Sequence, residues 1–187
     1  MKVLALSPNL NQRVQLSEGL LLAGIVKPIL STSIKQAEAV IKGGLDALLI
    51  ALDDEKDDQL QKIIHLSQKA TCPVALFLEN STKANIGELI EAGICTVVVD
   101  GLKANRIPRI FEATLHRYNK MHGLQIQLKN AQSALQERKL VDRAKSLLIE
   151  QRGISEPESY KLLQRAAMNR NCKISEIAQT VIFASEV

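Results

Sequence analysis

The stretch that decides the fold is Ala47-Leu48-Leu49-Ile50-Ala51-Leu52, six apolar residues in a row that run directly into Asp53 and Asp54. A continuous apolar run of this length is typical of a strand that is buried on both faces of a parallel sheet, because a strand with one wet face alternates instead. Four other short apolar runs have the same character, at residues 3–6, 28–30, 73–78 and 96–99.

The segments between these runs have helical spacing, for example Ala37, Val40 and Ile41 ahead of Gly43-Gly44. Strand and helix therefore alternate through about the first 104 residues, and right-handed crossovers would place helices on both faces of the sheet. We predict a five-stranded α/β domain with flavodoxin-like (βα)5 order over residues 1–104. In such sheets ligands bind beyond the carboxyl ends of the strands.

From about Ala104 onward the pattern is helical without strands. Apolar residues follow a 3-4-3-4 spacing that is typical of a short coiled-coil seam; they are Met121, Leu124, Leu128, Ala131 and Leu135. We predict a linking helix over residues 105–136 that pairs with a second copy. Because the seam covers only about two heptads, packing of this helix onto the chain's own domain is the alternative.

A second helix is predicted to begin at Ser155, because Ser155 and Glu158 form a capping-box pair and Pro157 suits the first turn. Tyr160 stands at an apolar position of this helix, which favours a place in the core. A third helix is indicated by Ile174, Ile177 and Val181. Residues 137–187 are therefore expected to form a three-helix bundle.

Charge divides the chain into two unlike parts. Through Lys103 there are 10 Lys/Arg against 12 Asp/Glu, whereas the remaining 84 residues have 14 against 8. A basic tail favours a polyanionic partner. The residues expected to form one basic face are Arg138, Lys139, Arg143, Lys145, Arg165, Arg170 and Lys173.

The remaining composition favours a soluble cytoplasmic protein. No signal peptide or spanning helix is indicated, so no membrane partner is expected. The three cysteines are far apart, without metal-ligand spacing. No motif of a nucleophile, a phosphate-binding loop or a metal centre occurs, so we expect no catalytic residues, no cofactor and no metal, and hence no enzyme.

Several motifs of the C-terminal part resemble the ANTAR domain, the RNA-binding module of the AmiR and NasT antiterminator family. The matching stretches are residues 137–148 (ERKLVDRAKSLL), Ser159-Tyr160, Leu163, Ala167-Met168 and residues 174–178. The sequence departs from the family pattern at Ser146, where Gly is usual, and at Ser159, where Ala is usual. Residues 97–107, leading into the long helix, are similar to the same junction of NasT-like nitrate regulators.

This resemblance implies an ANTAR bundle that binds leader mRNA with paired stem-loops and prevents a terminator hairpin. The seven basic residues would then contact RNA. It also implies control by a sensor or inhibitor protein, nitrate-binding in the nitrate regulators, and a homodimer or heterocomplex. The alternatives are a DNA-binding regulator with a helix-turn-helix tail and a protein-interaction adaptor that binds no nucleic acid.

The N-terminal part resembles a response-regulator receiver domain that has lost its phosphorylation chemistry. In a working receiver, acidic residues after the first strand hold Mg²⁺ and an Asp ending the third strand accepts phosphate. A Thr or Ser after the fourth strand supplies a hydroxyl, and a Lys after the fifth strand neutralises charge. Here Ser7-Pro8-Asn9 follow the first strand, Ala51 has the phosphoacceptor position, Leu78 the hydroxyl position and Asp100 the lysine position. A shift of one residue would place Asp53 or Asp54 near the strand end. We predict a pseudo-receiver that a partner protein controls.

Overall fold

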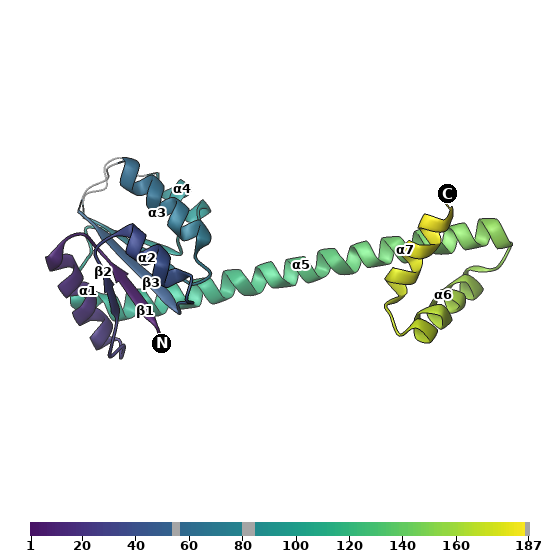
Figure 1. Cartoon of the computed structure of the whole chain (residues 1–187), viewed down its shortest axis with the longest axis horizontal. Helices are drawn as coiled ribbons and strands as arrows, with labels where there is room; N and C mark the ends of the chain where they lie inside the picture. Colours follow the sequence, from purple (N-terminus) through teal and green to yellow (C-terminus); the bar gives the residue numbers. More distant parts are fainter. Residues whose placement is uncertain (54–56, 80–84, 186–187) are drawn as a thin grey trace. The chain divides into compact units, whose positions relative to one another are not determined.

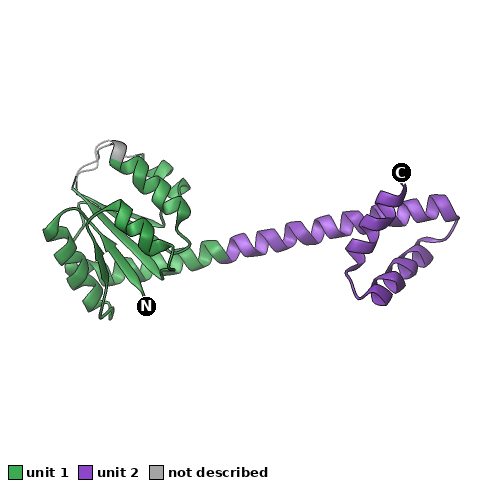
Figure 2. Cartoon of the chain, viewed as in Figure 1, with its two compact units in different colours: residues 1–122 green, residues 123–187 purple. Residues whose placement is uncertain are grey.

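The computed structural model describes residues 1–53, 57–79 and 85–185, and the chain divides into two compact units. Unit 1 comprises residues 1–122 and unit 2 comprises residues 123–187 (Figure 2). Among the described residues, no helix combines the length and the hydropathy needed to cross a membrane.

Unit 1 is built on a five-stranded parallel sheet with strand order β2-β1-β3-β4-β5. The strands are β1 Val3–Leu6, β2 Ile29–Ser31, β3 Ala47–Leu52, β4 Val74–Leu78 and β5 Thr96–Val99. All five coincide with the predicted apolar runs to within a residue, and the order is the flavodoxin-like one, so the predicted fold class is confirmed. The central strand β3 is buried at every position, as its unbroken apolar sequence requires.

Helices cover both faces of this sheet (Figure 1). One face packs against α2 Ile34–Ile41, α3 Asp57–Lys69 and α4 Ile86–Glu91 through a core that includes Leu4, Leu6 and Ile63. The other face packs against α1 Leu10–Leu22 and the start of α5 Ile107–Arg152. Successive strand residues point to opposite faces, so Val3 and Ala5 enter this second core.

Contacts at its start hold α5 on unit 1. A Cβ atom added to Gly19 of α1 would lie 2.5 Å from Cβ of Ile107, so only glycine permits this close approach. The short 3-10 helix η1 Ala104–Arg106 leads into α5. Further along, the hydroxyls of Thr114 and Thr96 are hydrogen-bonded to each other at 2.9 Å, and the Tyr118 hydroxyl donates to the carbonyl of Thr71 at 2.8 Å.

Unit 2 packs the last part of α5 against α6 Glu156–Arg170 and α7 Ile174–Ser185. Its core is small and apolar, with Ala144, Leu163 and Ala178 fully buried. Helix α5 ends before Gly153, whose φ of 64° is one that L side chains rarely adopt. The predicted capping box is confirmed, because the backbone N–H of Ser155 donates to Glu158 at 2.9 Å.

Candidate functional site

Polar side chains meet at the carboxyl edge of the sheet, where the chemistry of a receiver domain would lie. Asp53 directly follows β3 and accepts hydrogen bonds from Asn9 Nδ2 at 2.8 and 3.0 Å. The side chain of Gln12 in α1 donates to the same carboxylate at 2.6 Å. Ala51 is fully buried within β3, and its methyl group has no atom that could accept a phosphoryl group. Asp54, the other residue expected near this strand end, lies outside the described residues.

The same edge carries more charge than the sequence suggested. A hollow of about 270 Å³ beside it is lined by Gln12, Leu52, Phe77, Leu78, Glu79, Asp100, Gly101, Leu102 and Lys103. The sequence comparison assigned the lysine position to Asp100 and overlooked Lys103, which lines this hollow from three residues further on. The backbone explains why Lys103 lines this hollow although Asp100 has the aligned lysine position: Asp100 has a φ of 50° and turns the chain immediately after β5.

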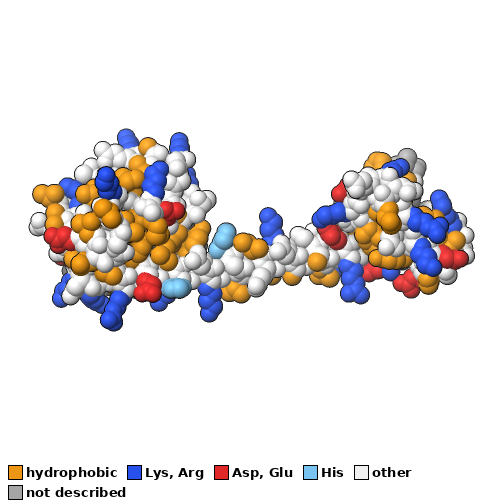
Figure 3. Space-filling model, turned by 90° about the horizontal axis from the view of Figure 1, so that it is seen from below, with side chains coloured by type: hydrophobic (Ala, Val, Ile, Leu, Met, Phe, Trp, Pro, Cys, Tyr) orange, Lys and Arg blue, Asp and Glu red, His pale blue; other side chains and the backbone are white. Residues whose placement is uncertain are grey.

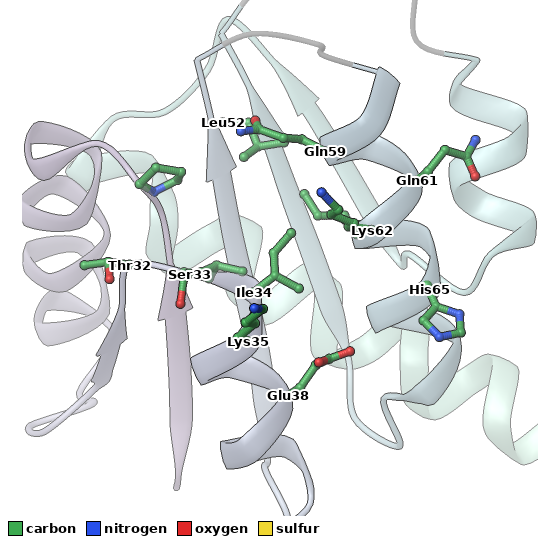
Figure 4. A pocket seen from close by; sticks show the side chains of 13 residues that line it. Thr32, Ser33, Ile34, Lys35, Glu38, Leu52, Gln59, Gln61, Lys62 and His65 are labelled. Atoms are coloured by element: carbon green, nitrogen blue, oxygen red, sulfur yellow. The ribbon is translucent and has the colours of Figure 1, made fainter.

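A second hollow, of about 750 Å³, lies between α2 and α3 (Figure 4). Buried Leu6, Leu52 and Ile63 contribute to its lining. Among the described residues that line it, Glu38 is the one with a carboxylate, which is 3.6 Å from the ammonium group of Lys69. The lining also carries two ammonium groups, an imidazole and two hydroxyls, those of Lys35, Lys62, His65, Thr32 and Ser33.

The middle of α5 exposes the predicted coiled-coil seam. Met121, Leu124, Leu128 and Leu135 are between 51% and 59% exposed, and Ala131 is exposed as well. Figure 3 shows hydrophobic side chains at the surface along this part of the helix. The alternative, in which the helix packs along the chain's own domain, would cover these side chains, and no described residue does so.

Lys145 and Lys173, both in the predicted RNA interface, form close ion pairs with acidic neighbours within unit 2. The ammonium group of Lys145 lies 2.7 Å from Asp142 and 2.9 Å from Glu156, and only 16% of its side chain is exposed. These hydrogen bonds, first that to Asp142, raise the pKa of Lys145. Lys173 lies 3.0 Å from Glu137, and this hydrogen bond likewise raises its pKa. Both lysines thereby connect α5 to other parts of the bundle.

The other five basic residues are exposed to solvent. Arg138 pairs loosely with Asp142 at 3.8 Å, and Arg143 also interacts with a neighbour. Lys139, Arg165 and Arg170 have no hydrogen bond or ion pair with any described residue. The exposed cationic groups of the predicted face therefore come from α5, from α6 and, at Lys173, from the loop after α6.

Helices α6 and α7 are joined by residues 171–173, where Asn171 adopts a left-handed conformation with φ of 50°. In a DNA-binding helix-turn-helix, the second helix enters the major groove. Helix α7 reads ISEIAQTVIFAS and contains neither Lys nor Arg.

The predicted core position of Tyr160 is wrong, since its side chain is 45% exposed. Leu163, one turn further along α6, enters the core in its place.

Comparison with known proteins agrees with this division. The model of the ANTAR domain matches residues 129–182, which cover most of unit 2.

Three relatives are regulatory proteins. The transcriptional regulatory protein PdtaR of Mycobacterium tuberculosis is 24% identical over 137 residues, which cover 73% of this chain and 67% of PdtaR. The aliphatic amidase regulator of Pseudomonas aeruginosa is 26% identical over 125 residues, covering 67% of this chain and 63% of that protein. The nitrate regulatory protein of Klebsiella oxytoca is 34% identical over 67 residues, covering 36% of this chain and 16% of that protein.

Unit 1 is similar in structure to the N-terminal domain of a response regulator/sensory box/GGDEF three-domain protein from Carboxydothermus hydrogenoformans. The TM-score is 0.52 at 18% identity, and the match covers 64% of this chain and 98% of that domain. At this identity the likeness concerns the fold. The chain therefore combines a receiver-like N-terminal domain with an ANTAR domain, and the three relatives described above are regulatory proteins.

Proposed function

We propose that this protein is a cytoplasmic transcription antitermination regulator that binds leader mRNA with paired stem-loops through its ANTAR domain. One observation carries the proposal: the segment that matches the ANTAR domain is also the segment where α5 and α6 expose Lys139, Arg165 and Arg170, which have no acidic partner among the described residues. Such groups bind phosphates and release counterions, and arginine also stacks on unpaired bases of RNA loops.

The seven basic residues of the predicted interface divide into two roles under this proposal. Arg138, Lys139, Arg143, Arg165 and Arg170 contact RNA. Lys145 and Lys173 are positioning residues, because binding RNA directly would first break their ion pairs at 2.7–3.0 Å. The free energy needed to break these ion pairs would reduce the net free energy of RNA binding.

A homodimer formed through the α5 seam would present two ANTAR domains to two stem-loops. Joining two binding modules raises the effective concentration at the second loop without any new contact. Four large apolar side chains exposed at heptad spacing support this arrangement.

We also propose that a partner sensor protein controls unit 1 and that phosphorylation does not. The buried Ala51 at the aligned phosphoacceptor position and the amide donors around Asp53 support this view. The local likeness to a nitrate regulatory protein favours nitrate or nitrite assimilation genes and a nitrate-binding partner. Acetyl phosphate or beryllofluoride with Mg²⁺ should change neither the mass nor the oligomeric state, and a Mg²⁺-dependent response would contradict this part.

The proposed organisation has three parts, a pseudo-receiver over residues 1–104, a linking helix over 105–136 and the ANTAR domain over 137–187. Limited proteolysis at a protein concentration below the dimer dissociation constant should cut first between residues 120 and 137, where α5 is then exposed. First cuts inside residues 140–185 would contradict the last boundary.

The decisive experiment compares binding to a two-hairpin leader RNA and to the same sequence as duplex DNA across a salt series. We expect selective RNA binding that weakens with salt. Lys139→Glu with Arg165→Glu should weaken RNA binding at least tenfold and lower the slope of log K against log salt by about 2. The control is Lys120→Glu, an exposed position in unit 1 with the same change of charge.

The experiment also separates the alternatives. A DNA-binding regulator would prefer the duplex, although α7 has no cationic side chain for the phosphates. A protein-interaction adaptor would bind both nucleic acids equally weakly, and the double variant would leave its partner affinity unchanged.

A further inference from the structure

The receiver fold implies a Mg²⁺ site at the carboxyl edge of the sheet, and the residues of this chain do not fit that ion. Mg²⁺ prefers hard oxygen ligands, above all carboxylates. No carboxylate follows β1 until Glu18, because residues 7–9 are Ser, Pro and Asn. Among the described residues, no group of three or more His, Cys, Asp or Glu side chains is placed to hold a metal ion.

Side-chain amides approach the carboxylates of this edge instead. Gln12 Nε2 donates to Asp53 at 2.6 Å and to Glu79 at 3.2 Å, so a single amide nitrogen bridges acidic residues that follow β3 and β4. Asn9 Nδ2 donates to both carboxylate oxygens of Asp53, at 2.8 and 3.0 Å. The partial positive charge between the carboxylates of Asp53 and Glu79 is therefore that of the Gln12 amide N–H groups, and not that of a metal ion.

The orientation of the Gln12 amide follows from its other partner. The hydroxyl of Ser7 accepts the backbone N–H of Asn9 at 3.1 Å, which leaves its proton for Gln12 Oε1 at 2.7 Å. A flipped amide would point its oxygen at two carboxylates, which would repel it. Gln12 is only 6% exposed, so water has little access to its amide group, whereas the carboxylates of Asp53 and Glu79 are exposed.

We propose that the Gln12 side-chain amide takes the place of the Mg²⁺ ion of a phosphorylatable receiver and closes the edge in one metal-independent arrangement. This inference rests on the proposed function, in which phosphorylation does not control unit 1. Gln12 is a positioning residue here. It holds Asp53 and Glu79 together without supplying a charge that could be removed.

The test is Gln12→Glu in the full-length protein, which replaces the two donor N–H groups with a third carboxylate beside Asp53 and Glu79. Without metal, the three acidic groups repel one another, and the melting temperature should fall. Mg²⁺ at about 10 mM should then raise the melting temperature of the variant by about 3–6 °C at constant ionic strength, whereas the wild type should not respond.

Asn11→Asp is the matched control. Asn11 lies in the first turn of α1, is exposed, and its side chain makes no contact in the network, so the same change of charge should produce no response to Mg²⁺. A Gln12→Glu variant that folds and ignores Mg²⁺ would overturn the inference, and the proposed function would stand. A wild-type protein that binds Mg²⁺ in calorimetry and responds to beryllofluoride would overturn both.

A measurement on the wild type covers the case in which Gln12→Glu does not fold. The side-chain amide protons of Gln12, followed by ¹⁵N NMR, should exchange with solvent at least tenfold more slowly than those of exposed Gln61. Exchange at the same rate as Gln61 would show that the bridge to Asp53 and Glu79 is not formed, and the inference would fail.

Discussion

Helix α5 carries apolar side chains that are exposed in its middle and buried near its end. Leu124 and Leu128 are more than half exposed, whereas Ala144 and Leu148, a few turns later, are at most 3% exposed. The later stretch is covered by α6 and α7, and no described residue covers the earlier one. Intrinsic propensity contributes little to a helix in water, so an apolar stripe of this kind requires another surface to cover it. Under the proposed function, the earlier stretch would take its cover from a second chain.

The two stretches also face different ways within unit 2. Leu128 and Ala144 are sixteen residues apart, which corresponds to a rotation of roughly 160° around a helix of 3.6 residues per turn. The seam therefore points away from α6 and α7. A second copy could pair along α5 without touching the core of the bundle.

The largest expected effect comes from charging the exposed stretch. Leu124→Glu with Leu128→Glu should raise the dimer dissociation constant by at least about 100-fold, because four carboxylates would face one another at the seam. Sedimentation equilibrium measures this change. Ile126→Glu is the control, since Ile126 is 48% exposed on another side of α5 and should leave the dimer intact. A dimer that survives the double variant would remove the seam from the interface.

A smaller effect is expected from the covered stretch and its neighbours. Leu163→Ala deletes a fully buried side chain in unit 2 and should lower the free energy of unfolding by about 3 kcal/mol. Leu162→Ala, at the preceding position, is 37% exposed and should cost less than about 1 kcal/mol. Urea unfolding followed by circular dichroism separates the two. Equal losses would mean that α6 is rotated from the orientation described.

Two lysines on α5 sharpen the comparison further. Lys145→Ala removes the connection from α5 to Glu156 and should lower the melting temperature slightly, with RNA affinity reduced only through that loss. Lys139→Ala should leave the melting temperature unchanged and weaken RNA binding by about 1 kcal/mol or less. Scanning calorimetry and filter binding on both variants give the result, and the reverse pattern would exchange their assigned roles.

The smallest effect concerns pH. The hydrogen bond from Lys145 holds the pKa of Asp142 below its ordinary 3.8, and those from Ser155 hold the pKa of Glu158 below 4.5. Their contribution to stability is therefore present above these values and is lost as the pH falls through the lowered ones. The raised pKa values of Lys145 and Lys173 act below 10.5, and their contribution is lost as the pH rises past it.

Thermal unfolding of residues 123–187 at several pH values checks this expectation. The melting temperature should be highest between about pH 5 and 10 and should decline modestly on either side. Lys145→Ala should flatten both flanks. A wild-type profile that already lacks both flanks would show that these ion pairs contribute nothing to stability.

Much of unit 1 was predictable because each of its strands coincides with a short apolar run in the sequence. A run such as residues 47–52 has no polar residue and therefore suits only a strand buried on both faces, and five such runs with helices between them leave few topologies. The bridge from Gln12 to Asp53 was not predictable, because 41 residues separate the two side chains and only the sheet brings them together. Lys103 was missed for a similar reason, since the chain turns at Asp100, in a left-handed conformation, before Lys103 lines the same hollow as Glu79.

The sequence by itself determined the order of strands and helices, the basic character of the C-terminal part and the heptad spacing of the seam, because each depends on residue types at short separations. Only the tertiary structure decided which lysine and arginine side chains of the C-terminal part pair with acidic residues. Lys145 and Lys139 lie in the same basic stretch of the sequence. In the structure Lys145 forms an ion pair with Glu156 of the next helix, whereas Lys139 has no ion pair with a described acidic residue. Coulomb attraction acts on distance in space, and α5 and α6 set that distance by packing around Leu163.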